Sequence, residues 1–390
     1  MITVNDSVRP WMNDELSMMR DAAARLLMQE MVPQRARWDR EGIVDRASWR
    51  KLGEAGLLCP SLPDAYGGGG GTLAHEIVML EELSRCGLDA LAGGYAIHSS
   101  IVPHYILAYA TEAQKRSWLP KLAAGEAIGA LAMSEPGAGS DVQGIKTRAK
   151  RDGDYYLISG SKIFISNGQN ADYILVACKT DVTEGAKGIS LIVLETNEPA
   201  QATGFRRGRN LEKIGYHSQD TSELFFEEVR VPAANLLGQV EGCGFAQLMT
   251  QLAWERLIAG INAAVHIEGA VAMATEYTKN RRAFGKRIFD FQNTQFKLAE
   301  GATIASVARI FIDQLIVRLL GGELDPVSAA KAKLWLTEQE GRVVDECLQL
   351  FGGYGYMLEY PIARLYTDIR LNRIVGGSSE IMKTIIARSL

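Results

Sequence analysis

The spacing of apolar residues changes twice along this chain of 390 residues. In roughly the first 125 residues apolar side chains recur at helical intervals, as in 15–30 and 74–85, and a run of glycines at 67–71 marks a turn. From about residue 128 the pattern changes to short β-rich runs, and helical intervals return after residue 244. This order predicts a helical region, then a small antiparallel sheet or barrel, then a second helical region.

The second helical region has clear helix boundaries. Asp325 and Pro326 suit a helix start, since an aspartate caps the first turn and proline fits its first position. Glycine pairs at 321–322 and 352–353 suit helix ends. We expect an α+β protein whose last part is a four-helix bundle. The domains are predicted over residues 1–127 (α-helical), 128–240 (β-sheet or barrel) and 241–390 (bundle), with bundle helices at 245–280, 292–320, 326–350 and 380–388.

Composition excludes several classes of function. With 47% hydrophobic and 23% charged residues the chain is typical of soluble globular proteins, and its formal net charge of -4 gives no reason to expect a nucleic-acid partner. No apolar run comes near the ~18 residues of a membrane span, so none is expected. The first ten residues lack a signal or transit pattern, which favours a cytoplasmic protein of a prokaryote over one of the mitochondrial matrix. The scattered cysteines and histidines predict neither a disulfide framework nor a metal site.

Two glycine- or serine-containing segments near the predicted sheet are suited to a cofactor. Residues 132–141 follow a short strand, and Pro136 with Gly137 and Gly139 forces an irregular turn whose backbone N–H groups suit a flavin edge or a phosphate. Alone, this turn also fits a plain strand connection. Twenty residues later, segment 160–168 places the aromatic Phe164 beside a strand hydroxyl. Phe164 could stack on a ligand ring or belong to the sheet core.

A third segment, 281–285, contains two arginines after the first long helix. The guanidinium fork of Arg281 can donate to two oxygens of a pyrophosphate at once. Taken alone, an arginine pair at this position is more often a solvated helix end. Glycines in the later segment 349–355 permit close approach of the backbone to a ligand, which favours the binding interpretation.

Together these motifs, with segments 253–259 and 374–381, resemble the acyl-CoA dehydrogenase family over almost the whole chain. The resemblance implies FAD as cofactor and an acyl-CoA as substrate. Ser140 matches a contact to the nucleotide end of the substrate, and Arg256 is expected to contact its CoA moiety. The contacts expected around the flavin are Leu131, Met133, Ser134, Gly139, Phe164 and Ser166. The contacts expected to reach the FAD of a neighbouring subunit are Arg281, Phe284, Gln292, Gln349 and Gly353. Ser378 and Glu380 are the contacts expected on the C-terminal loop.

The same resemblance predicts the catalytic base. Many family members carry a catalytic glutamate at the position of Gly376, whereas the long-chain and isovaleryl types place it in a Glu-Arg-Leu segment, present here as 255–257. Glu255 is therefore the predicted base, and Gly376 is expected to contribute its backbone N–H to the developing enolate. Glu255 could otherwise be a surface glutamate that pairs with Arg256.

The implied reaction removes an α-proton and a β-hydride from an acyl-CoA, fatty or branched, to give the trans-2-enoyl thioester. No second redox motif is found in the sequence, so an electron-transfer flavoprotein is the expected acceptor. The resemblance also implies a homotetramer, with a dimer as the alternative. Three other functions stay open: oxidation of an acyl group held by a carrier protein, a flavin monooxygenase or oxidase of the same superfamily, and a flavin-binding scaffold without catalysis.

Overall fold

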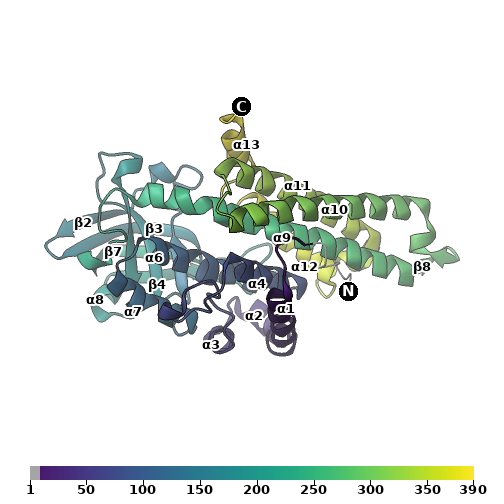
Figure 1. Cartoon of the computed structure of the whole chain (residues 1–390), viewed down its shortest axis with the longest axis horizontal. Helices are drawn as coiled ribbons and strands as arrows, with labels where there is room; N and C mark the ends of the chain where they lie inside the picture. Colours follow the sequence, from purple (N-terminus) through teal and green to yellow (C-terminus); the bar gives the residue numbers. More distant parts are fainter. Residues whose placement is uncertain (1–8) are drawn as a thin grey trace.

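The computed structural model describes residues 9–390 and shows an elongated molecule (Figure 1). The sheet lies at one end of the long axis, and three long helices run from it to the other end (Figure 1). Residues 1–8, on which the expected location partly rests, lie outside the described residues.

The N-terminal helical region is confirmed. It comprises α1 (Asp14–Leu26), α2 (Arg35–Glu41), α3 (Arg46–Glu54), α4 (Leu73–Arg85), α5 (Asp89–Tyr95), α6 (Val102–Tyr109) and α7 (Glu112–Ala123). The predicted glycine turn precedes α4, where the N–H groups of Gly70 and Gly71 donate to the carbonyls of Leu62 and Pro60 at 2.8 and 2.9 Å. A π-helical stretch, η5 (Ala96–Ile101), joins α5 to α6. Such stretches are rare and are often found at functional sites.

The middle region is one curled sheet. Its strands are β1 (Gly129–Ala132), β2 (Arg148–Asp152), β3 (Tyr155–Ser166), β4 (Tyr173–Lys179), β5 (Ile189–Glu195), β6 (Phe205–Asn210) and β7 (Thr221–Pro232), with the short α8 (Pro199–Ala202) before β6. The order is β1-β4-β2-β3-β7-β6, with β5 paired to β4. The expectation of a purely antiparallel sheet is wrong, because β1 runs parallel to β4. β2, which follows β1 in the chain and forms a hairpin with β3, also runs parallel to β4.

The C-terminal region contains the predicted long helices, α9 (Gly244–Asn280), α10 (Gln292–Leu320) and α11 (Pro326–Phe351), and the shorter α13 (Ser379–Ala387). Asp325 caps α11 by accepting the Ser328 N–H at 2.8 Å, as expected. A further helix, α12 (Pro361–Asp368), was not predicted, because eight residues are too few for a periodic signal. Between α9 and α10 lies a small hairpin of β8 (Arg282–Ala283) and β9 (Lys286–Arg287).

Helix α9 bears on the expected absence of a membrane span. By length and composition alone this helix of 37 residues could cross a membrane, so that expectation is not confirmed. However, 78% of its most apolar window is buried inside the molecule. It packs against α4, α10 and α11 at the centre of the molecule (Figure 1). An apolar helix buried on all sides is also what the core of a large globular protein contains.

Candidate active site

Glu255 lies on α9, facing the N-terminal helical region. Its side chain is only partly accessible to solvent, and the Tyr105 hydroxyl donates a hydrogen bond to its Oε1 at 2.8 Å. Burial raises the pKa of the Glu255 carboxyl to about 7, against the opposing effects of the Tyr105 hydrogen bond and the Arg256 charge. A carboxyl with this pKa can accept a proton near neutral pH and release it again.

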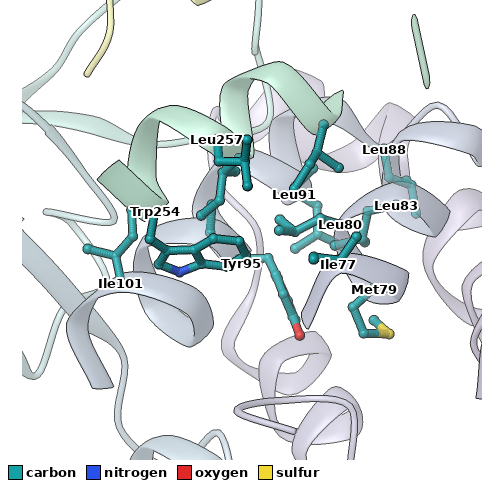
Figure 2. Packing of buried hydrophobic residues seen from close by; sticks show 14 of the residues in the cluster. Ile77, Met79, Leu80, Leu83, Leu88, Leu91, Tyr95, Ile101, Trp254 and Leu257 are labelled. Carbon is teal, nitrogen blue, oxygen red and sulfur yellow. The ribbon is translucent and has the colours of Figure 1, made fainter. Parts of the chain in front are cut away.

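The helix that carries Glu255 is held in place by the residues beside it. The indole N–H of Trp254 donates to the Ser100 carbonyl in η5 at 2.8 Å. Figure 2 shows Trp254 and Leu257 of α9 packed toward Tyr95 and Ile101. These contacts fix the orientation of Glu255 relative to the π-helical stretch and to Tyr105.

Tyr105 is a site residue that the sequence analysis missed. It lies 150 positions before Glu255 in the chain and belongs to no recognisable motif. Only the folded arrangement, in which η5 contacts α9 and leads into α6, brings its hydroxyl to the carboxylate. No periodicity or spacing could have identified it.

Gly376 lies in the loop before α13 and adopts a φ of +65°. A Cβ built on it would meet only Lys333 Cε, at 3.8 Å, so the glycine leaves open space beside the backbone. Within residues 9–390 its backbone N–H has no intramolecular acceptor. It is therefore a donor available to a ligand, as predicted for an enolate oxygen.

The charge of Arg256 acts on groups at both predicted catalytic positions, on Glu255 and on Lys333 beside Gly376. It is 6% exposed, and its Nε has no hydrogen-bond partner among the described residues. Burial lowers the pKa of the Lys333 ammonium to about 8, and the positive charge of Arg256 contributes to that effect. The alternative of Glu255 as a surface glutamate paired with Arg256 is disfavoured, because Glu255 is only partly exposed and its hydrogen bond comes from Tyr105. Contact between Arg256 and CoA stays a prediction.

Hydrogen bonds from β3 hold two of the predicted flavin contacts, Met133 and Ser134, beside the strand that carries a third, Phe164. Lys162, on β3, donates to the Met133 carbonyl and to Glu135 Oε1, both at 2.9 Å. The Ile163 N–H donates to the Ser134 carbonyl at 3.0 Å. These bonds hold the irregular turn after β1 against β3, so Met133 and Ser134 lie beside the strand that carries Phe164.

Phe164 is not part of the sheet core. It is 66% exposed, with a φ of +62°, where the register of β3 and β7 shifts between Lys162 and Ile165. A left-handed conformation is costly for an aromatic residue, and such strain is found mostly at functional positions. The ring is presented outward, where it can cover a flat ligand. Of the nearby predicted contacts, Leu131 and Ser166 are half-buried, whereas Gly139 and Ser140 are exposed.

A second group of predicted cofactor residues lies at the opposite end of the bundle, near β8 (Figure 1). A hollow of about 560 Å³ there is lined by Arg281, Gln349 and Gly353, together with Tyr277 and Tyr354. The Arg281 guanidinium carbon lies 5.6 Å from the centre of the Tyr354 ring. We call this hollow the terminal hollow. Phe284, 94% exposed at the tip of the hairpin, and the exposed Gln292 lie near it in the sequence.

The remaining predicted contacts lie beside Gly376. Ser378 is the residue before α13, and Glu380 is exposed in the first turn of that helix. A hydrogen bond involving Ser378 lowers the pKa of the Glu380 carboxyl. An ionised carboxylate at a helix N-terminus is stabilised by the helix dipole, so Glu380 is poorly suited to act as a base.

Family models match three successive parts of the chain. They describe the N-terminal domain of acyl-CoA dehydrogenase (residues 13–126), its middle domain (130–229) and its C-terminal domain (242–390). The chain belongs to the acyl-CoA dehydrogenase family. Its members are FAD-dependent oxidoreductases that act on CH–CH bonds of acyl-CoA thioesters, as the sequence resemblance implied.

Individual relatives agree with this assignment. The chain is 41% identical over 385 residues to the mitochondrial long-chain specific acyl-CoA dehydrogenase of Sus scrofa, which covers 98% of this chain and 88% of the relative. An acyl-CoA dehydrogenase from Geobacillus kaustophilus superimposes with a TM-score of 0.94, at 47% identity, over 98% of this chain and 99% of that one. A glutaryl-CoA dehydrogenase from Mycobacterium smegmatis in complex with FADH2 superimposes with a TM-score of 0.89, at 26% identity, over 97% and 95%.

The described residues fit FAD at two surfaces. The exposed Phe164 ring and the turn over Met133 and Ser134 suit the flat flavin. A Cβ built on Gly139 or Gly353 would meet no described atom within 4 Å, so a ligand can approach the backbone there. Arg281 suits the negative charge of a pyrophosphate.

Proposed function

We propose that this chain oxidises an acyl-CoA to its trans-2-enoyl-CoA, with Glu255 as the base that removes the α-proton. The observation that carries this assignment is the Glu255 carboxyl itself, which has a pKa of about 7 and accepts a hydrogen bond from Tyr105. The position where many relatives hold a glutamate is occupied here by Gly376, which leaves the reaction without a base unless Glu255 supplies one.

The residues of the chain divide the work of proton removal. Glu255 takes the α-proton on its carboxylate and is the only ionisable group that the proposal requires to change its charge. The free N–H of Gly376 donates to the thioester oxygen as negative charge develops there, which lowers the barrier to enolate formation. FAD supplies the acceptor for the β-hydride when it is bound.

The substrate class proposed is a fatty or branched acyl-CoA, supported by the 41% identity to a long-chain specific enzyme. The proposed electron acceptor is an electron-transfer flavoprotein. Anaerobic bleaching of the flavin by a panel of acyl-CoAs, with carrier-protein thioesters in parallel, tests the substrate. Bleaching by carrier-bound thioesters alone, or hydrogen peroxide formation at the full turnover rate in air, would contradict the proposal.

The proposed assembly is a homotetramer. Strand β3, which carries Phe164, belongs to the sheet at one end of the molecule, whereas the terminal hollow lies near β8 at the other end (Figure 1). We infer that a second copy brings its hollow to the flavin edge of the first, which a dimer also allows. Sedimentation of the FAD-loaded protein tests this assembly, and a stable, fully flavinated monomer would contradict it.

A further inference from the structure

One face of α11 holds the loop that contains Gly376. The Lys333 ammonium donates to the carbonyls of Asn372 and Gly377, at 2.9 and 2.8 Å. Further along the same helix, the Glu338 carboxylate accepts a hydrogen bond from the Ser379 hydroxyl at 2.7 Å. Lys333 therefore ties together two carbonyls that lie on either side of Gly376 in the chain.

Burial of the charged Lys333 side chain is energetically unfavourable for a residue that only holds a loop in place. Its residue is only 1% exposed, and its hydrogen bonds go to neutral carbonyls rather than to a carboxylate. Burial lowers the pKa of its ammonium to about 8, and the Arg256 charge adds to this effect, while Glu340 and Glu338 oppose it. Burying a charge without a paired counter-charge destabilises the fold, so retention of this charge calls for a role beyond packing.

A second layer of buried groups fixes the partner of Lys333. The Asn372 amide donates to both oxygens of Glu340, at 3.0 and 3.1 Å. Glu340 in turn contacts His266 Nδ1 at 2.5 Å, and His266 Nε2 lies 2.7 Å from Asp89. Burial disfavours the charged imidazole, but Asp89 and Glu340 outweigh it and raise the pKa of His266 to about 10. The loop thus rests on a charged network anchored in α5, α9 and α11.

We propose that Lys333 is a positioning residue for α-proton removal. It holds the segment 372–377 so that the free Gly376 N–H points at the thioester oxygen. Its charge, together with that of Arg256, adds positive potential where the enolate forms, and this potential is strong because both groups are buried. This inference rests on the proposed function, since it requires an enolate to form next to Gly376.

The test uses a 3-thia-acyl-CoA bound to the FAD-loaded enzyme. The α-proton of this analogue can be removed, but the sulfur at the β-position cannot give up a hydride, so proton removal is observed alone. The enolate is followed by its long-wavelength charge-transfer absorbance with the flavin as the pH is varied. Lys333→Met removes the ammonium at similar length, Lys333→Arg retains the charge, and Lys331→Met is the control at an exposed lysine of the same helix.

Lys333→Met should ionise the bound analogue only at a pH at least one unit higher than the parent does. Its kcat should fall by up to about 10²-fold, the effect of losing an oxyanion donor, because the Gly376 N–H is no longer held in place, while KM changes by less than about threefold. Lys333→Arg should recover part of this loss, and Lys331→Met should match the parent. Ionisation of the analogue at the parental pH in a FAD-loaded Lys333→Met protein would overturn the proposal.

Two further comparisons keep the outcomes separate. If Lys333→Met loses FAD or no longer melts cooperatively, the measurement is repeated with Lys333→Gln, which keeps a donor for one carbonyl. Ionisation of the analogue by Lys333→Gln at the pH of the parent counts equally against the proposal. If the parent itself neither ionises the analogue nor is bleached by acyl-CoA, the proposed function has failed. If the parent does both and the Lys333 variants do the same, only the role of Lys333 has failed.

Discussion

The catalytic region around Glu255 and Gly376 and the terminal hollow differ in how complete they are within one chain. Around Glu255 and Gly376 the groups are partly enclosed and are oriented by neighbours, such as Tyr105 and Lys333, that come from distant parts of the chain. At the terminal hollow, Arg281 lies over Tyr354 but is exposed, and Phe284 is 94% exposed on its hairpin. The region around Glu255 and Gly376 is complete once a single chain has folded, whereas the terminal hollow requires a second copy of the chain in the proposed assembly.

This difference implies different responses to mutation. Changes in the inner region should affect chemistry and leave FAD content unchanged, because its residues act on the substrate proton. Changes at the terminal hollow should affect FAD retention and assembly and leave the intrinsic chemistry intact.

The largest effect is expected for Glu255→Gln. The amide keeps the shape and can still bond Tyr105, but it cannot accept the α-proton. The rate of anaerobic flavin reduction by acyl-CoA should fall by at least ~10²–10⁴-fold, with FAD content unchanged. Glu276→Gln, at an exposed glutamate of the same helix, is the matched control and should keep the parental rate. Reduction of Glu255→Gln at that rate would assign the base elsewhere.

Moving the base should restore part of the lost rate. In Glu255→Gly with Gly376→Glu, the new side chain enters open space, because its Cβ would meet only Lys333 Cε at 3.8 Å. Recovery should stay incomplete, since a φ of +65° strains a non-glycine residue by about 1–3 kcal/mol. A glutamate at Gly377 is the control, because its Cβ would lie 2.8 Å from Met382 Cε. Stopped-flow flavin reduction measures both, and equal recovery would show that position 376 has no special access.

At the terminal hollow, Arg281→Ala should weaken FAD binding about 10–100-fold, since a hydrogen bond to a charged group contributes about 1.5–3 kcal/mol. Titration of the apoprotein with FAD gives this ratio. Arg282→Ala is the control, because Arg282 bonds the Gly285 carbonyl of its own hairpin at 3.1 Å. If both variants weakened FAD binding equally, the loss would reflect a general charge effect. Arg281 would then have no specific role in binding FAD at the terminal hollow.

The sequence predicted the fold well where the signal was local. The long helices were expected from apolar spacing and from Asp325 and the glycine pairs, and their bounds agree within about two residues. The parallel pairing of β1 with β4 could not be predicted, because strand direction depends on where the chain returns to the sheet. Glu255 was predicted from its local segment and stays a prediction, whereas Tyr105 and Lys333 could not be predicted because their contacts are made only after folding.

A smaller effect is expected for Tyr105→Phe. Loss of the hydroxyl removes a hydrogen bond that favours the charged form of Glu255, so the pKa of the carboxyl should rise further above 7. The acidic limb of the pH profile of kcat/KM should move upward by about one unit, because one unit corresponds to about 1.4 kcal/mol. Tyr109→Phe, on the same helix, is the control. An unmoved limb in Tyr105→Phe would mean that the hydroxyl does not act on the base.

The smallest effect is on stability, because burial of the Glu255 carboxylate is expected to destabilise the folded protein. In the folded state the pKa of Glu255 is about 7, above its ordinary 4.5. The folded state therefore binds the proton of Glu255 more tightly than the unfolded state does. The contribution of this group is therefore greatest below pH 4.5 and is lost as the pH rises to about 7. Glu255→Gln has no charge to bury, so its melting temperature should exceed the parental value by a few degrees at pH 8 and by less at pH 5. Thermal unfolding of both FAD-loaded proteins at the two pH values measures this difference. A gain that is the same at pH 5 and pH 8 would show that Glu255 is not buried at the expense of stability, and would remove the physical basis for its raised pKa.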